Sequence, residues 1–253
     1  MQRADVIVPY RPIEGYAYVR SRLLRRLRHL VRRAPGGRPL AIHTPRRTTQ
    51  RPNEGSGRGG RSAPARRAAR SRYEEVVDAV KQVVESLKVG DPQDPDTFIG
   101  PMIRRDQQQR VRDYIEIGIK EGARLVTGGP QVPTGLERGH YVTPTIFADV
   151  DNTMRIAQEE IFGPVLVVIA YQDEDDAVRI ANDSEYGLSG GVWSTDEQHA
   201  LAIARRIRTG TMTVNGAPIG FDGPFGGFKA SSLGREYGFA GLNTYLEYKT
   251  VTL

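Results

Sequence analysis

The sequence predicts an α/β domain in which a largely parallel sheet is flanked by helices, preceded by a disordered or irregular arginine-rich segment. Two observations support this prediction. From residue 71 onward, short apolar runs alternate with segments of helical periodicity. Residues 1–70 show no such order and are rich in Arg, Gly, Pro, Ala and Ser. With 253 residues, the chain can form one or two domains, each with its own core.

Charge is divided unevenly along the chain. Residues 1–72 hold 19 Arg, no Lys and three acidic residues, a balance of +16 in a chain whose net charge is +6. Residues 73–253 therefore carry −10, and the basic pI reflects the head of the chain alone. No apolar run is long enough for a transmembrane helix or for the core of a signal peptide, so we expect a cytoplasmic protein that does not contact membranes.

The sequence contains no cysteine and only four histidines. The absence of cysteine excludes disulfides, thiolate nucleophiles and most structural zinc sites. Because the histidines are scattered, we expect no metal site.

The arginine-rich segment, residues 1–70, is open to several interpretations. Low hydrophobicity with high net charge is typical of disorder. A stripe of leucines within residues 22–33 would suit a basic arm on nucleic acid or a membrane surface, and the acid-poor composition would suit an organelle transit peptide. Nucleic acid is not expected as a partner, because no aromatic residues are interleaved with the arginines for stacking. We favour a frameshifted or misannotated start, since GC-rich DNA read out of frame encodes this composition.

Two helices are predicted between residues 71 and 122. The first follows Ser71-x-x-Glu74, a capping-box pattern, and stops at Gly90. The second covers about residues 105–121 and is ended by Gly122. Apolar residues at helical spacing predict one inward face for each helix: Val76, Val77, Val80, Val83, Val84 and Leu87 in the first, and Val111, Tyr114, Ile115 and Ile119 in the second.

Strands and helices alternate in the remainder. The run Val165–Ala170 is apolar without alternation and rich in β-branched residues, which predicts a fully buried strand. Asp173 is expected to cap a helix to Ala181, and Thr195 a helix to Arg208. Further extended segments are predicted at residues 123–127, 141–147, 191–194 and 211–214, with an exposed strand in the tail at 244–253.

The first candidate site lies just before the buried strand, in Glu159-Glu160-Ile161-Phe162-Gly163-Pro164. Gly-Pro turns the chain there, so Glu160 and Phe162 lie at the mouth of the strand. At that place a carboxylate can accept hydrogen bonds from ribose hydroxyls, and a ring can pack on a flat ligand. The competing interpretation is a Glu that caps a turn and a Phe that fills the core.

A second stretch, Pro224-Phe225-Gly226-Gly227-Phe228-Lys229-Ala230-Ser231-Ser232-Leu233-Gly234-Arg235-Glu236, carries a family resemblance together with the first. With Tyr186-Gly187-Leu188-Ser189 and Val214-Asn215-Gly216 at matching spacing, the two stretches resemble the C-terminal catalytic-domain part of the aldehyde dehydrogenase superfamily. The resemblance covers about residues 71–253, whereas residues 1–70 do not match.

The resemblance implies an NAD- or NADP-dependent oxidation of an aldehyde to a carboxylic acid. In that family a Cys thiolate attacks the aldehyde to give a thiohemiacetal, a hydride passes to the nicotinamide, and a Glu-activated water releases the acid. Glu160 would hold the nicotinamide-side ribose, with Phe162 beside the ring. Gln107 and Arg110 would contact the adenosine-side ribose, and Phe225 would line the aldehyde tunnel. The tail at 244–253 would join subunits in a homo-oligomer.

The catalytic groups of that family are missing from this sequence. At the family's spacing the nucleophile would stand near Gly60, but the chain has no Cys. No segment before Ser71 resembles the general-base Glu, the oxyanion donor or the phosphate-binding unit. Because such groups each lower the barrier substantially, we expect a truncated dehydrogenase with no catalytic residue, inactive alone, that binds dinucleotide weakly or not at all. The alternative is a non-catalytic scaffold that docks onto full-length homologues and uses the basic arm on an acidic partner.

One motif points to a different class of enzyme. Gly187-Leu188-Ser189-Gly190-Gly191 satisfies G-x-S-x-G, the nucleophile pattern of serine hydrolases. That pattern requires a strand before the serine and a helix after it. The order predicted here is the reverse, so a serine hydrolase is not expected.

Overall fold

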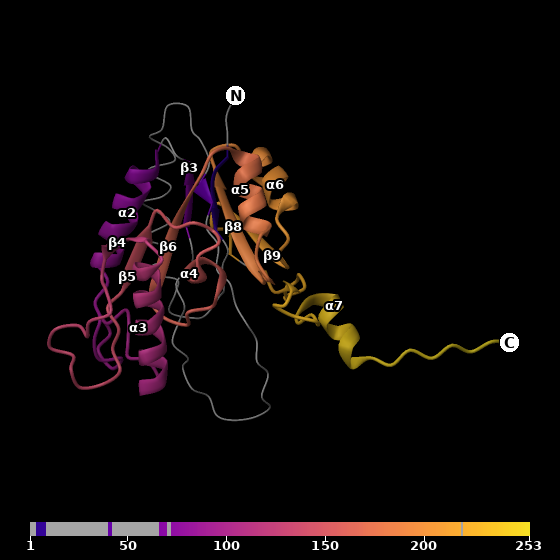
Figure 1. Cartoon of the computed structure of the whole chain (residues 1–253). Coiled ribbons are helices and arrows are strands. Elements are labelled where there is room, and N and C mark those ends of the chain that lie inside the picture. The colour runs from indigo at the N-terminus through magenta and orange to yellow at the C-terminus, as the bar shows by residue number, and fades with distance from the viewer. Residues whose placement is uncertain (1–3, 9–39, 42–65, 70–71, 219) are drawn as a thin grey trace.

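The computed structural model of the chain describes residues 4–8, 40–41, 66–69, 72–218 and 220–253. Its centre is an eight-stranded sheet in the order β4-β5-β6-β3-β2-β1-β8-β9 (Figure 1). The strands are β1 (Ala4–Val8), β2 (Leu40–Ala41), β3 (Arg66–Ala69), β4 (Arg124–Thr127), β5 (Thr145–Ala148), β6 (Val165–Tyr171), β8 (Ser189–Ser194) and β9 (Thr211–Val214). A separate two-stranded ladder pairs β7 (Tyr186–Gly187) with β10 (Phe228–Lys229).

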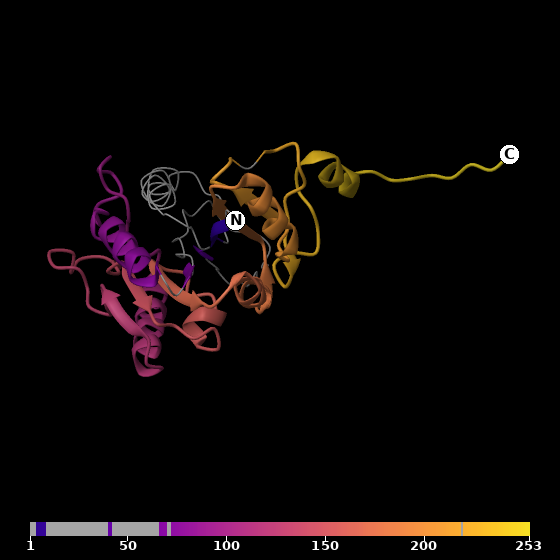
Figure 2. The ribbon, with the colours of Figure 1, turned by 90° about the horizontal axis from the view of Figure 1, so that it is seen from above.

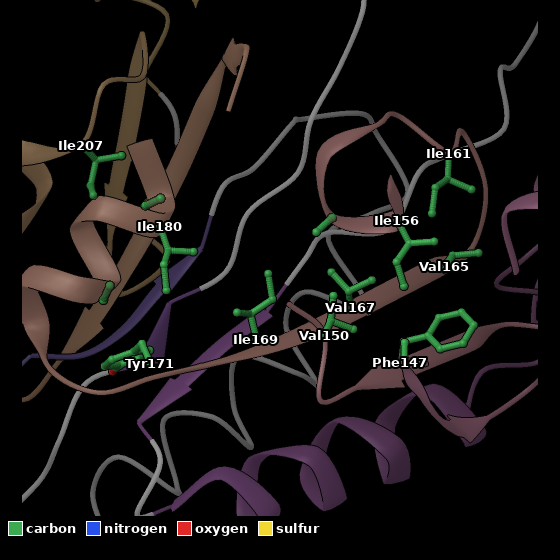
Figure 3. Packing of buried hydrophobic residues seen from close by; sticks show 14 of the residues in the cluster. Phe147, Val150, Ile156, Ile161, Val165, Val167, Ile169, Tyr171, Ile180 and Ile207 are labelled. Carbon is green, nitrogen blue, oxygen red and sulfur yellow. The ribbon is translucent and has the colours of Figure 1, made fainter. Parts of the chain in front are cut away.

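The helices are α2 (Tyr73–Glu85), α3 (Arg105–Lys120), α4 (Arg155–Gln158), α5 (Glu174–Asn182), α6 (Glu197–Arg206) and α7 (Gly238–Leu242), with a 3-10 turn η2 (Asn243–Tyr245). They cover both faces of the sheet, and β6 shows how. Its residues Val165, Val167, Ile169 and Tyr171 face a core cluster that includes residues of α3, α4, α5 and α6 (Figure 3). The residues between them, Leu166 and Val168, face α2 on the other side. A strand buried on both faces needs an unbroken apolar run, as the sequence predicted.

Parallel pairing predominates in the sheet, although the sheet is mixed. The pairs β5–β6, β6–β3, β2–β1 and β8–β9 are parallel, whereas β4–β5, β3–β2 and β1–β8 are antiparallel. Following these pairings across the sheet gives β6, β8 and β9 the same direction. Their amino ends therefore lie along one edge of the sheet.

Most predicted elements are found, although α2 ends at Glu85 instead of running to Gly90, and its N-cap is Arg72, which makes no side-chain capping hydrogen bond. Asp173 caps α5, since its side chain accepts a hydrogen bond from the backbone N–H of Asp176. The predicted cap of α6 was wrong by one residue: Asp196, not Thr195, accepts from the N–H of His199. Ile119 was also placed wrongly, because the inward position next to Ile115 is taken by Gly118 and Ile119 is 43% exposed.

The arginine-rich segment contributes three short strands to the middle of the sheet, β1, β2 and β3, which its composition did not predict. The rest of residues 1–70, including Gly60 and the leucine stripe, lies outside the described residues. Figure 2 shows the other end of the chain extending away from the body after α7. In the tail, η2 replaces the start of the predicted strand, and residues 246–253 pair with no strand of the described part of the chain.

Candidate functional site

The loop that joins α4 to β6 presents the two candidate side chains at the amino end of β6. Glu160 is buried, with 5% of its surface exposed. Ile161 points into the core, and Figure 3 shows it near Ile156 and Val165. Phe162 is half-buried and has φ of +65°, a left-handed conformation that costs a residue with a side chain roughly 1–3 kcal/mol. Contacts around the loop must offset that cost.

Helix α3 supplies those contacts. A terminal nitrogen of the Arg110 guanidinium donates to the backbone carbonyl oxygen of Glu160 at 2.6 Å. Gly163 lies directly against Val111: a Cβ at position 163 would stand 2.5 Å and 2.6 Å from the two Cγ atoms of that valine. Glycine is needed here for the close approach of the loop to the helix, and not for an unusual φ.

A third contact joins the loop to α3 through Glu159. The Tyr114 hydroxyl donates to Oε2 of Glu159 at 2.6 Å, and Arg155 donates to both carboxylate oxygens at 2.7 Å and 3.0 Å. The Arg155 guanidinium holds the pKa of the Glu159 carboxyl below its usual value, while burial followed by the nearby carboxylate raises the pKa of Tyr114. The guanidinium carbons of Arg110 and Arg155 lie 5.5 Å and 5.7 Å from the centre of the Tyr114 ring.

Gln107 lies one turn before Arg110 and Val111 on α3 and is half-buried. Helical spacing puts Gln107, Arg110 and Tyr114 on one face. The structure therefore brings Arg110 into contact with the loop that carries Glu160 and Phe162, and Gln107 lies one turn away on the same face of α3. Sequence reasoning missed Glu159, Arg155 and the hydroxyl of Tyr114. The four-residue spacing of Arg155 and Glu159 in the sequence was the available signal for a pair.

Phe225, the predicted tunnel residue, belongs to a second compact loop. Its backbone forms an antiparallel bridge with Glu236, and its ring centre lies 6.2 Å from that of Tyr237. A Cβ at Gly226 would stand 2.5 Å from the carbonyl oxygen of Gly234, which explains a glycine at that position.

This second loop is tied to the sheet and to α5. A Cβ at Gly210, just before β9, would stand 1.6 Å from the carbonyl oxygen of Gly226. Nζ of Lys229 donates to the carbonyl oxygens of Asn182 and Ser184 at 2.6 Å and 2.8 Å, at the carboxyl end of α5.

The two loops occupy the same edge of the sheet, at the amino ends of β6 and β9. Ligands of open α/β sheets usually bind at the carboxyl ends of the strands. The candidate residues lie at the amino ends, on the opposite side of the sheet from the usual site. At the carboxyl end of β9, the side chain of Asn215 instead accepts a hydrogen bond from the N–H of Ser194 at 2.9 Å.

Other kinds of site find less support in the described residues. Ser189 begins strand β8, so no helix follows it as a hydrolase nucleophile requires. His199 faces Glu174, with Nε2 at 2.8 Å from Oε2. In the part of the chain that the structure describes, no group of three or more His, Asp or Glu side chains is placed to hold a metal ion. No described helix is both long and apolar enough to cross a membrane.

Comparison with known proteins assigns a family to this arrangement. Residues 66–251 match the aldehyde dehydrogenase family. The chain is 53% identical over 186 residues to geranial dehydrogenase from Castellaniella defragrans, a match that covers 74% of this chain and 38% of that protein.

Solved structures agree. An aldehyde dehydrogenase of Mycobacterium tuberculosis, complexed with NAD+, matches with a TM-score of 0.69 and 52% identity over 71% of this chain and 37% of that one. A mutant aldehyde dehydrogenase C of Pseudomonas syringae, complexed with NAD+ and octanal, matches with a TM-score of 0.72 and 36% identity over 97% of this chain and 45% of that one.

The match begins a few residues before the stretch that the sequence motifs indicated, and the chain spans about 38% of the length of the relatives it matches. Sequence and structural similarity agree along that stretch, and on this ground the chain belongs to the aldehyde dehydrogenase family.

Proposed function

We propose that this chain carries the nicotinamide-side part of a dinucleotide site and one wall of the aldehyde tunnel of an NAD- or NADP-dependent aldehyde dehydrogenase. The observation that supports the proposal best is the Glu160 loop. A buried carboxylate and a half-buried ring stand next to each other on a strained loop fastened to α3 by several contacts. Strained backbone held in this way is typical of ligand sites.

The chemistry of these residues suits part of the cofactor. A carboxylate accepts hydrogen bonds, and the paired hydroxyls of a ribose donate them. An aromatic ring such as that of Phe162 packs on a flat nicotinamide. When bound, NAD or NADP would supply the acceptor for the hydride. Gln107 and Arg110 would lie toward the adenosine-side ribose, and Phe225 would line the path of the aldehyde.

We further propose that the chain does not oxidise aldehydes by itself. It has no cysteine to act as the nucleophile, and a thiolate is the group that can both attack an aldehyde at neutral pH and leave again. Dinucleotide should bind more weakly than millimolar, because no segment of the chain resembles the unit that binds the phosphates of the cofactor in the family.

A direct assay tests this proposal. The purified chain is mixed with octanal or geranial and with NAD+ or NADP+, and reduced nicotinamide is followed by absorbance. No turnover above a blank without protein is expected, while a full-length relative under the same conditions should turn over. Clear turnover by this chain would refute the proposed inactivity.

A second candidate function is a non-catalytic scaffold that docks onto full-length homologues. The tail favours it, because large apolar side chains there are exposed: Phe239 75%, Tyr245 85%, Tyr248 78%, Val251 72% and Leu253 118%. Exposed apolar area of this kind is typical of surfaces that bind another protein. Homo-oligomerisation through residues 244–253 would cover the last four of these side chains.

Sedimentation of the chain, alone and mixed with a full-length relative, separates the two assemblies. A cytoplasmic location stays a prediction, which fractionation of cells would check.

A further inference from the structure

The Glu160 loop is held by three contacts that come from one turn and a half of α3. Arg110 binds the carbonyl oxygen of Glu160, Val111 supports Gly163, and Tyr114 binds Glu159. Together these contacts hold Phe162, whose φ of +65° is disfavoured without such support. One of these three contacts sets the direction of the Glu160 side chain.

Backbone geometry favours the Tyr114 contact. Glu159 is extended, with φ of −101° and ψ of 149°. Successive side chains of an extended backbone point to opposite sides. Fixing the Glu159 carboxylate toward α3 therefore also restricts the direction in which the Glu160 side chain leaves the backbone.

The partners of Glu159 are not equivalent. Arg155 is the first residue of α4, and Glu159 directly follows that helix. Because the two residues are neighbours in sequence, their ion pair does not tie the loop to another part of the fold. Tyr114 stands on α3, 45 residues away in sequence, and its hydroxyl binds the carboxylate at 2.6 Å. Of the described hydrogen bonds of the Glu159 carboxylate, the one with Tyr114 connects it to α3, and the Arg110 guanidinium on the same helix also attracts it.

We propose that Tyr114 is a positioning residue for Glu160: its hydroxyl, through Glu159, fixes the loop that presents the Glu160 carboxylate to the nicotinamide-side ribose of a dinucleotide. The inference rests on the proposed function, of which it explains the geometry. The Tyr114 ring also lies beneath the guanidinium of Arg110, so the same side chain supports the second contact to the loop.

Tyr114→Phe tests the proposal because it removes the hydroxyl and keeps the ring. Hydrogen exchange of the full chain should become roughly tenfold faster at the amides of residues 160–163, the effect expected from losing a hydrogen bond to a charged group. Exchange in β6 and in the body of α3 should not change. Glu159→Ala should give the same local effect, and the double variant should add nothing further.

A matched control is Tyr248→Phe. The Tyr248 hydroxyl donates to Oδ1 of Asn243 at 2.8 Å in the exposed tail, so this variant makes the same chemical change and also loses a tyrosine hydrogen bond, far from the loop in the fold. It should leave exchange at residues 160–163 unchanged.

Saturation-transfer NMR with NAD+ tests whether the loop contacts the ligand. The method detects weak complexes and shows which protons of the ligand lie close to the protein. In the native chain, the protons of the nicotinamide and its ribose should receive more saturation than those of adenine. Tyr114→Phe should lower the nicotinamide-side signal at least threefold and leave the adenine signal as it was.

Each result of these experiments either supports or overturns one of the two proposals. Unchanged exchange in Tyr114→Phe would overturn the positioning role, whatever the ligand does. Faster exchange without any nicotinamide-side signal in the native chain would overturn the assignment of the loop to a dinucleotide, and the proposed function with it. Faster exchange with an undiminished nicotinamide-side signal would show that Glu160 is placed by other contacts.

Discussion

Replacing Gly163 by alanine tests whether the Glu160 loop depends on its close approach to α3. The new Cβ would stand 2.5 Å and 2.6 Å from the Cγ atoms of Val111, far inside normal van der Waals contact. Overpacking of this kind costs about 1–3 kcal/mol, and the smaller entropy of the unfolded alanine chain returns about 0.4–1 kcal/mol. We therefore expect a loss of about 1–2 kcal/mol in the free energy of unfolding, or roughly 3–6 °C in Tm.

A compensating substitution makes the test specific. Val111 is fully buried, so Val111→Ala alone should cost about 1.5–3 kcal/mol. In the double variant the alanine methyl at 163 enters the space left by the valine. The double variant should then be less destabilised than the sum of the single variants by at least about 1 kcal/mol.

Urea unfolding followed by circular dichroism measures all three variants. Gly234→Ala is the control, because a Cβ there meets nothing within 4 Å, and it should change stability little. Strict additivity of Gly163→Ala and Val111→Ala would refute the reasoning, since the clash would then not involve Val111.

Three other substitutions test a buried hydroxyl, the Glu159 ion pair and the role of Glu160. Tyr73→Phe removes a buried hydroxyl that donates to the carbonyl oxygen of Val168 and accepts from the N–H of Asp149, so urea unfolding should show a loss of about 1–3 kcal/mol, against little change for Tyr248→Phe. The pKa of Glu159 is lowered in the folded chain mainly by Arg155, so its contribution to stability is present above about pH 4.5 and is lost as the pH falls through the folded pKa. As the pH is lowered from neutral to acid, the Tm should therefore fall less steeply for Glu159→Gln than for the native chain. Equal slopes would count against the ion pair. In a full-length relative, exchanging the glutamate at the Glu160 position for glutamine should lower kcat more than it raises the KM for NAD+, because ribose positioning is what the change removes.

The sequence revealed those features that depend on local patterns. The apolar run at Val165–Val168 identified a strand buried on both faces, and Asp173 identified the start of α5. Thr211–Val214 was found with its bounds as predicted. In each case the signal lies within a few neighbouring residues, which sequence reading captures well.

What the sequence did not reveal depends on contacts between distant segments. The hydroxyl of Tyr114 meets Glu159 across 45 residues, and its spacing on α3 suggested no more than a core position. The positive φ of Phe162 has no signature in residue type, since the left-handed region usually takes glycine or asparagine. The tail was read as a strand from its alternation, yet a strand needs a partner, and none of the described strands provides one.

The order of strands sets the distance between the Glu160 loop and the Phe225 loop. Between β6, which follows Glu160, and β9, which supports the Phe225 loop, the sheet inserts β3, β2, β1 and β8. At about 4.8 Å per strand, the two loops are separated by roughly 24 Å along the edge. Two of the spacers, β1 and β2, lie outside the family match that begins at residue 66. The spacing between the Glu160 loop and the Phe225 loop therefore depends in part on strands that lie outside the family match, and losing one of them would bring the two loops closer by about one strand width.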